Sequence, residues 1–216
     1  MKRIIERVRR LSNLSIMLTG IILFIFVFPI VNTIKGLGLL LVPVSYTLMI
    51  LSVTAVVNPR KKRYYSLIAL AIIFQWVVFF SDIKLHPIIS YLSFLFSVVV
   101  FSLATYTMIH QITREKEVNA ALIMQAVLGY LLIGIILVLT NVLIISVNPH
   151  AIGFNTPHPT LADVIYYSFI TYTTIGFGDI SPVTPAARSI AILFGLTGQL
   201  YLTIIIAFII GKFSSK

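Results

Sequence analysis

The residues best suited to chemistry form one short run, Thr174-Ile175-Gly176-Phe177-Gly178-Asp179. Glycine adopts positive φ angles that other residues adopt only at a cost. A chain that alternates between left- and right-handed conformations can turn successive carbonyl groups to the same side. Four such segments around one axis would stack rings of oxygen atoms that replace the water shell of a cation. The Thr174 hydroxyl can add a further ring at the inner end, so the run predicts a path that binds cations.

A short helix is expected immediately before this run. Thr160 and Asp163 have the spacing of a helix-capping signal, and Pro159 stands just ahead of them. A helix over residues 161–173 would be roughly 20 Å long, which is too short to cross a bilayer. Such a helix can enter a membrane only where protein or a water-filled cavity surrounds it. Its C-terminal end at Thr173 would direct the negative end of the helix dipole toward a cation.

The composition requires a membrane as the solvent for the chain. Of the 216 residues, 59% are hydrophobic and only 10% are charged, and the mean hydropathy is +1.05. Soluble domains carry roughly 25% charged residues. The absence of cysteine excludes disulfides, thiolate metal sites and cysteine nucleophiles. No nucleophile–base set or metal cluster appears, so we expect neither an enzyme nor a cofactor.

Six apolar stretches are long enough, or nearly long enough, to cross a bilayer, which takes about 20 helical residues. They cover residues 11–34, 37–57, 64–80, 85–109, 120–147 and 185–210. The first is too long for a cleaved signal peptide, and no small-residue cleavage site closes it. The sequence therefore predicts an all-α membrane protein with six transmembrane helices and a re-entrant helix between the last two.

The basic residues predict the orientation. Residues 2–10, 60–63, 114–116 and 212–216 hold thirteen of the 16 Lys and Arg residues, and the intervening loops hold three. The positive-inside rule therefore places both termini in the cytoplasm. Residues 1–10 form either an interfacial amphipathic helix or a charged stop before the first span. The residues expected to contact anionic lipids are Arg3, Arg7, Arg10, Arg60, Lys61, Lys62 and Arg63.

Residues 174–179 resemble the selectivity filter of potassium channels, whose common form is Thr-Val-Gly-Tyr-Gly-Asp. Ile175 and Phe177 are variants that occur in potassium-selective members of the family. The resemblance extends over roughly residues 120–213, through the pair Tyr166-Tyr167, residues 182–184, Arg188 and Gly198. It implies a six-helix channel that assembles as a homotetramer, with K⁺ as the permeant ion. The filter residues would be Thr174, Ile175, Gly176, Phe177 and Gly178, with K⁺ bound at the first four.

The same resemblance implies a domain organisation. Residues 1–10 would be a cytoplasmic segment, 11–112 a four-helix domain like a voltage sensor, 113–119 a linker and 120–216 the pore domain. The pore domain would contain an outer helix, a pore helix (161–173), the filter (174–179) and an inner helix (185–213). Voltage-gated members carry Arg or Lys at every third position of the fourth helix, whereas residues 85–109 contain none. Voltage gating needs mobile charges, and moving one charge across 100 mV is worth about 2.3 kcal/mol. We therefore expect little or no dependence of gating on voltage. No nucleotide-binding Gly-rich fingerprint and no calcium-binding acidic loop is present either. Regulation could come from lipids at the basic clusters, from a separate regulatory subunit, or not at all.

Support for the filter is expected from two residues. Asp179 would lie at the outer mouth. Ile170 occupies the position at which many family members have an acid, so Tyr166 is the candidate hydrogen-bond donor to Asp179. The alternative is that Asp179 is a solvated rim charge that merely attracts cations.

On the inner helix, family geometry and helical spacing predict a stripe that lines the cavity, with an apolar constriction at its inner end. The stripe consists of Gln199, Leu202, Ile206 and Ile210. The same side chains could instead face lipid or other helices. Gly198 is a candidate hinge, although Gly198 and Gly195 could equally allow close helix packing. His110, His150 and His158 could sense pH, or they could be ordinary interfacial residues.

Other functions remain open. A potassium transporter is disfavoured by the single filter run with two glycines. A regulatory subunit of another channel is disfavoured by the intact filter. A non-selective cation channel is the remaining alternative, because Ile175 and Phe177 depart from the common filter sequence.

Overall fold

The computed structural model describes residues 2–31, 37–56, 62–80, 87–115 and 117–214. Side chains are described from residue 11 onward, except those of residues 37–42, 54–56, 62–64, 78–79 and 87–89. The chain divides into two compact units, Met1–Gly129 and Tyr130–Lys216, whose boundary lies inside a helix. Each unit is described below by itself.

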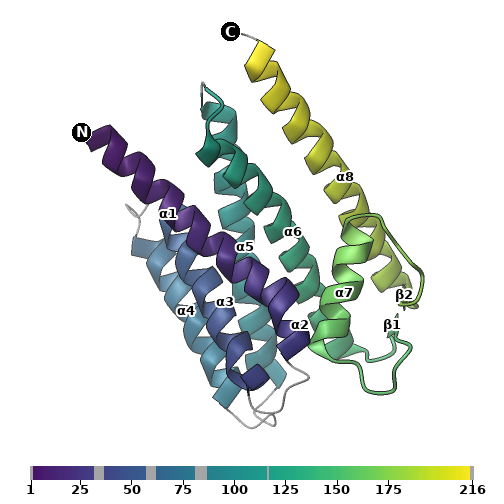
Figure 1. Cartoon of the computed structure of the whole chain (residues 1–216). Helices are drawn as coiled ribbons and strands as arrows, with labels where there is room; N and C mark the ends of the chain where they lie inside the picture. The colour runs from purple at the N-terminus through teal and green to yellow at the C-terminus, as the bar shows by residue number, and fades with distance from the viewer. Residues whose placement is uncertain (1, 32–36, 57–61, 81–86, 116, 215–216) are drawn as a thin grey trace. The chain divides into compact units, whose positions relative to one another are not determined.

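The first unit is a bundle of apolar helices, coloured from purple to teal in Figure 1. It consists of α1 (Lys2–Ile22), the π-helix η1 (Leu23–Val27), α2 (Phe28–Val31), α3 (Leu37–Val56), α4 (Lys62–Phe80), α5 (Pro87–Arg114) and the first part of α6 (Ala120–Val147). α3 packs against α1, α4 and α5, and α4 also packs against α5. Among the described side chains, the core of this unit includes a cluster of three aromatic rings, in which Tyr46 contacts both Phe24 and Phe101.

The π-helix in the first unit has a local cause. Pro29 has no N–H group, and its ring would clash with the carbonyl four residues earlier in a regular α-helix. The turn before it is wider, and the Phe28 N–H donates to the Leu23 carbonyl five residues back. Such single π turns are a common way to absorb an irregularity within a helix.

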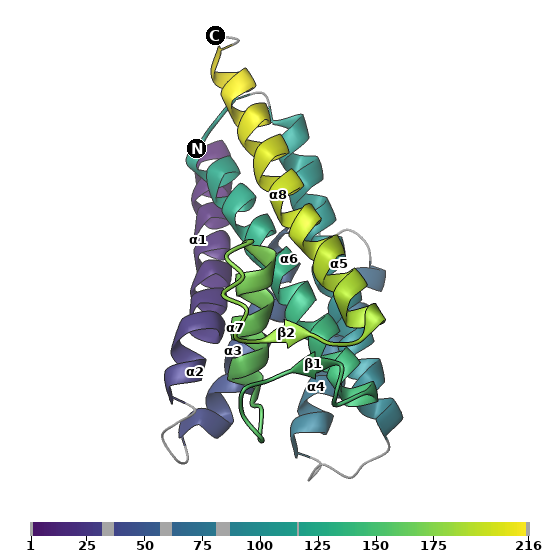
Figure 2. The ribbon, with the colours of Figure 1, turned by 90° about the vertical axis from the view of Figure 1, so that its right-hand side faces the viewer.

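The second unit is built around a short helix. It contains the rest of α6, β1 (Ile152–Gly153), α7 (Leu161–Tyr172), β2 (Ser181–Pro182) and α8 (Pro185–Ser214). β1 and β2 form an antiparallel pair in which Ile152 lies opposite Pro182. α7 packs against α8, and Figure 2 shows the strand pair beside them. The segment between α7 and β2 therefore begins at a helix end and finishes at a strand pair.

Four helical segments within the described residues are long and apolar enough to cross a membrane. They are Leu11–Val31, Ser90–Arg114, Ala120–Val147 and Pro185–Ser214, and the described parts of α3 and α4 contain shorter apolar stretches, Pro43–Val53 and Tyr65–Val77. The chain is thus a mostly helical, multi-pass membrane protein. The number of six spans stays a prediction.

Several boundaries differ slightly from the expected ones. α1 begins at Lys2, so the basic segment 1–10 continues into the first span without a break. α5 extends to Arg114, beyond the expected end at residue 109, and a basic residue in the last turn favours that end of a helix. The predicted pore domain starts at residue 120, whereas the second compact unit starts at Tyr130.

Some predictions fall outside the described residues. The expected end of the first span at 34, the end of the second at 57 and the start of the fourth at 85 are among them, as are Arg60 and Lys61. The other expected lipid contacts lie in described helices, but their side chains lie outside the described set: Arg3, Arg7, Arg10, Lys62 and Arg63.

Candidate functional site

α7 is held at its start by the predicted capping signal. Asp163 Oδ2 accepts hydrogen bonds from the Thr160 N–H at 2.7 Å and from the Thr160 hydroxyl at 2.8 Å. The helix ends at Tyr172, one residue earlier than expected, with Thr173 as its C-cap. The Thr173 hydroxyl donates to the Phe169 carbonyl at 2.7 Å. The predicted filter segment, residues 174–179 and called the filter segment below, follows directly.

α6 holds α7 through two contacts that sequence reasoning missed. A Cβ added to Gly134 of α6 would lie 2.6 Å from Cε1 of Phe169, so the ring lies against the α6 backbone. Seven residues later, Asn141 Nδ2 donates to the Ser168 hydroxyl at 2.9 Å, and both side chains are buried. Small residues and interhelical hydrogen bonds are the usual means of packing helices in lipid, where apolar side chains gain little from burial.

Gly198 brings α8 close to the end of α7. A Cβ at Gly198 would lie 2.5 Å from the Tyr172 carbonyl oxygen and 2.9 Å from Cε2 of its ring. α8 runs unbroken through this position. The geometry gives Gly198 a packing role at the start of the filter segment, and its role as a hinge stays a prediction.

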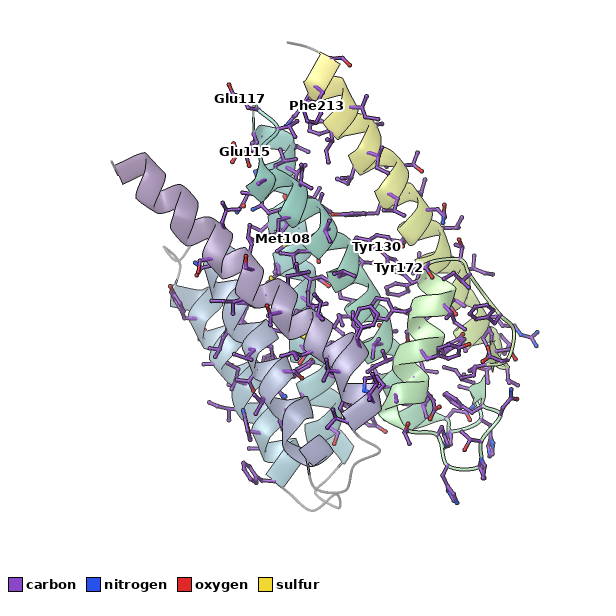
Figure 3. The ribbon with its side chains drawn as sticks, viewed as in Figure 1. Met108, Glu115, Glu117, Tyr130, Tyr172 and Phe213 are labelled. Atoms are coloured by element: carbon purple, nitrogen blue, oxygen red, sulfur yellow. The ribbon has the colours of Figure 1, made fainter. Side chains whose placement is uncertain are left out.

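Three tyrosines gather at the same junction. The ring of Tyr130 lies 4.7 Å from that of Tyr172 and 6.0 Å from that of Tyr201, measured between centroids. Figure 3 shows Tyr130 and Tyr172 adjacent between α6 and the end of α7. Tyr172 is fully buried, and within the described part of the chain its hydroxyl has no hydrogen-bond partner. Nothing in the sequence pattern marked these residues as a cluster.

The backbone of the filter segment alternates in handedness. The φ angles of Thr174, Gly176 and Gly178 are 62°, 54° and 82°. This is the alternation expected of a segment that turns successive carbonyls to one side. Glycine adopts such angles freely, but Thr174 is β-branched and is the only non-glycine residue with positive φ in the described chain. Strain of this kind costs about 1–3 kcal/mol and persists only where neighbouring contacts impose it.

Two backbone hydrogen bonds tie the filter segment to the last turn of α7. The Thr174 N–H donates to the Thr171 carbonyl at 3.1 Å, and the Gly176 N–H donates to the Ile170 carbonyl at 3.0 Å. Ile170, whose side chain is apolar, thus helps to hold this segment through its backbone carbonyl. The every-second-residue spacing of 174, 176 and 178 is the signal that could have revealed the conformation of Thr174.

One side of the filter segment is not covered by its own chain. The Ile175 and Phe177 side chains are 58% and 71% exposed. Apart from the adjoining residues, no described atom lies within 4 Å of a Cβ built on Gly176 or Gly178. Both large apolar side chains are therefore mostly exposed in one copy of the chain.

The inner end of the filter segment is bonded to α8. Gln199 Nε2 donates a hydrogen bond to Thr174 Oγ1 at 2.9 Å. The sequence placed Gln199 in the expected cavity as the one polar group near its top, and the structure adds this direct contact with the first filter residue.

At the other end, the Tyr166 phenol interacts with the Asp179 carboxylate, which raises the pKa of the phenol because a carboxylate beside it disfavours the phenolate. The structure thus brings together the two residues expected to form this pair. Their role in supporting a filter stays a prediction.

A strand pair ties the outer loop to the segment that follows the filter. The Val183 N–H donates to the Ala151 carbonyl at 2.9 Å, beside the pairing of β1 with β2. Arg188 of α8 donates through Nε to the Pro182 carbonyl at 3.2 Å. The buried core beneath the pair consists of Ala151, Ile152, Tyr167 and Ala187. The outer end of the segment is therefore anchored on both α7 and α8.

The remaining predicted residues lie on or near exposed surfaces. On α8, Ile206 and Ile210 are exposed and Leu202 is partly exposed, so their place in a cavity stays a prediction. His150 and His158 are exposed in the outer loop, and the His110 ring stacks on Tyr106. Among the described residues there is no group of three His, Cys, Asp or Glu side chains that could hold a metal ion.

Comparison with known proteins shows similarity to ion channels over the C-terminal part of the chain. Residues 127–215 match the family model described as ion channel. Two-pore potassium channel 5 of Arabidopsis thaliana is 36% identical over 97 residues, which cover 44% of this chain and 22% of that protein. Two pore potassium channel c of Oryza sativa subsp. japonica is 44% identical over 50 residues, 23% of this chain and 11% of that protein. The matches thus span about a fifth or less of these relatives, and no solved structure matches the chain. Residues 127–215 are thus similar to ion channel domains.

Proposed function

We propose that the chain is one subunit of a homotetrameric, potassium-selective channel that conducts K⁺ passively across the membrane. The observation that carries the proposal is the alternating backbone at Thr174, Gly176 and Gly178. Four such segments would stack rings of carbonyl oxygens, with the Thr174 hydroxyls as the innermost ring, in place of the hydration shell of the ion. K⁺ is the transported ion, and no resident cofactor is needed.

The exposed side of the filter segment supports an assembly of several copies, and the resemblance to potassium channels sets their number at four. One chain supplies one strand of the pore and leaves Ile175 and Phe177 largely exposed. α8 also carries a row of exposed apolar side chains on the same unit: Ile192, Leu193, Leu196, Leu200 and Ile204. In cyclic symmetry, each copy would cover the surfaces that its neighbour leaves open.

Potassium is favoured over other ions by two lines of support. The run Thr174–Asp179 resembles potassium-channel filters, and the similar plant proteins are named as potassium channels. Ile175 and Phe177 depart from the common filter sequence, so a non-selective cation channel is the alternative that the experiment below would reveal.

Voltage dependence is proposed to be weak or absent. α5, the fourth expected span, contains no Arg or Lys before Arg114 in its last turn. Because moving one charge across 100 mV is worth about 2.3 kcal/mol, a helix without such charges cannot gather the energy for steep gating. Both termini are proposed to be cytoplasmic from the distribution of Lys and Arg.

The test is the reversal potential of the purified protein in planar bilayers under opposed gradients of K⁺ and Na⁺. A reversal near the potassium equilibrium potential is expected, with a current that varies little with voltage apart from the driving force. A reversal near zero would replace the proposal with a non-selective channel. Absence of current from assembled protein, also after co-expression with candidate partner channels, would contradict a conducting role.

A matched pair of variants sharpens this test. Gly178→Ala places a Cβ on a residue with φ of 82°, so it should distort the filter and abolish selectivity. Gly211→Ala lies on α8 with open space around its Cβ and should leave the reversal potential unchanged.

A further inference from the structure

The residue that begins the filter segment is strained, and hydrogen bonds from two parts of the chain hold it. Thr174 has a φ of 62° although it is β-branched. Such a conformation is an outlier for this residue type and requires surrounding contacts to maintain it. Among the described residues, two hydrogen bonds do so: the Thr174 N–H donates to the Thr171 carbonyl, and the Thr174 hydroxyl accepts from Gln199 Nε2. Only the second involves the side chain of Thr174.

The contact from Gln199 comes from a well-placed backbone. The preceding residue, Gly198, is buried against the Tyr172 carbonyl, so closely that a Cβ would lie 2.5 Å from the oxygen. α8 is therefore in direct contact with the end of α7 at the point where Gln199 reaches the filter segment. The 2.9 Å hydrogen bond spans 25 residues of sequence, so it joins the inner helix to the filter segment across the chain.

We propose that Gln199 is a positioning residue that holds the strained Thr174 and its hydroxyl in place, and thereby keeps the innermost ion site of the filter formed. This inference rests on the proposed function. In a channel, the Thr174 oxygens would hold the ion as it enters from the cytoplasmic side. Without the bond from Gln199, the Thr174 side chain is free to rotate and its backbone can relax toward negative φ. The innermost site is then lost and conduction stops until it reforms.

An ion in the site should substitute for the missing bond. A bound K⁺ attracts the Thr174 oxygens and favours the conformation that Gln199 otherwise maintains, because a ligand shifts an equilibrium toward the state that it binds. A variant without the bond should therefore conduct in shorter bursts at low K⁺ concentration and recover as the concentration rises. A residue that only packs the helices would not give this dependence on the ion.

The experiment is single-channel recording of Gln199→Met, whose side chain has nearly the same length and no hydrogen-bond donor. A neutral hydrogen bond shifts an equilibrium by roughly two- to tenfold, so mean burst duration should fall about fivefold at low cytoplasmic K⁺ and approach the wild-type value at high K⁺. Gln199→Asn keeps the amide on a shorter side chain that cannot reach Thr174, and it should behave in the same way. It also serves as the test if the Met variant does not assemble.

Thr203→Val is the matched control. Thr203 lies one turn further along α8, and its hydroxyl bonds only to the Gln199 carbonyl of its own helix, at 2.8 Å. This nearly isosteric change removes a polar group from the same helix without touching Thr174, and it should leave burst duration unchanged at every K⁺ concentration.

The results separate this inference from the proposed function. A wild-type protein without potassium-selective current would overturn the proposed function itself. A selective wild type with Gln199 variants that match it would overturn only the role of Gln199. Assembled Gln199 variants that stay silent at every K⁺ concentration would also contradict the proposal, because it requires that K⁺ restores conduction. A Gln199→Asn channel with wild-type bursts would contradict it too, because the proposal requires a side chain long enough to reach Thr174.

Discussion

The contact between Gly198 and the end of α7 can be tested with three glycines of one helix. An alanine Cβ at Gly198 would lie 2.5 Å from the Tyr172 carbonyl oxygen, whereas ordinary contacts begin near 3.4 Å. The two helices would have to separate by about 0.9 Å, the difference between these two distances. The obstacle is a backbone atom at the helix end that precedes the filter, so no side-chain rotation can relieve it.

Comparison between variants isolates the cost of this clash. Alanine is favoured over glycine inside a helix by about 1 kcal/mol, and that gain is common to Gly198→Ala and Gly211→Ala. Gly211 has open space around its Cβ, so it reports the gain alone. Overpacking costs about 1–3 kcal/mol, so Gly198→Ala should be less stable than Gly211→Ala by that amount per subunit. Gly195→Ala, with its nearest atom 3.9 Å away, should resemble Gly211→Ala.

The measurement is the midpoint of thermal unfolding in detergent, followed by circular dichroism, with assembly checked by size-exclusion chromatography. For a chain of this size, 1 kcal/mol shifts the midpoint by about 2–4 °C, so the two variants should differ by about 2–12 °C. Equal midpoints would refute the reasoning from close approach. That result would favour the alternative role of Gly198 as a hinge, in which alanine changes gating and leaves the packing intact.

Three further predictions concern the surroundings of the filter segment. Gly134→Ala should lower the free energy of unfolding by about 1–3 kcal/mol through its clash with Phe169. A second change, Phe169→Leu, should restore much of it in the same thermal assay, and no rescue would contradict the contact. Tyr172→Phe should leave the free energy of unfolding unchanged or raise it, by about 3 kcal/mol at most, because the buried hydroxyl has no partner in the described chain. A clear loss would show that this hydroxyl is bonded in the assembled channel. Tyr166→Phe removes the interaction of the phenol with the Asp179 carboxylate, so open dwell times should shorten severalfold in single-channel recordings, and unchanged dwell times would indicate a solvated rim charge.

Local features were predictable because their causes are local. The Thr160–Asp163 cap positions the start of α7 within its own first turn, which is why the sequence placed this helix to within one residue. Gly176 and Gly178 are the residues that most easily adopt positive φ, and both do so. The apolar stretches predicted long helices, because only a helix satisfies its own backbone hydrogen bonds in lipid.

The faces of those helices were not predictable in the same way. α6 and α8 are apolar on all sides, so no amphipathic pattern distinguishes the face toward protein from the face toward lipid. The contacts of Gly134 with Phe169 and of Asn141 with Ser168 join residues far apart in sequence, and each partner alone looks ordinary.

The sequence by itself determined the type of site: a glycine-containing segment after a capped short helix, in a chain that requires a membrane. Only the tertiary structure decided how that segment is held, with Tyr166 at its outer end and Gln199 at its inner end. The physical reason is that backbone conformation depends on neighbours in sequence, whereas the contacts that maintain a strained conformation come from wherever packing brings a polar group within about 3 Å.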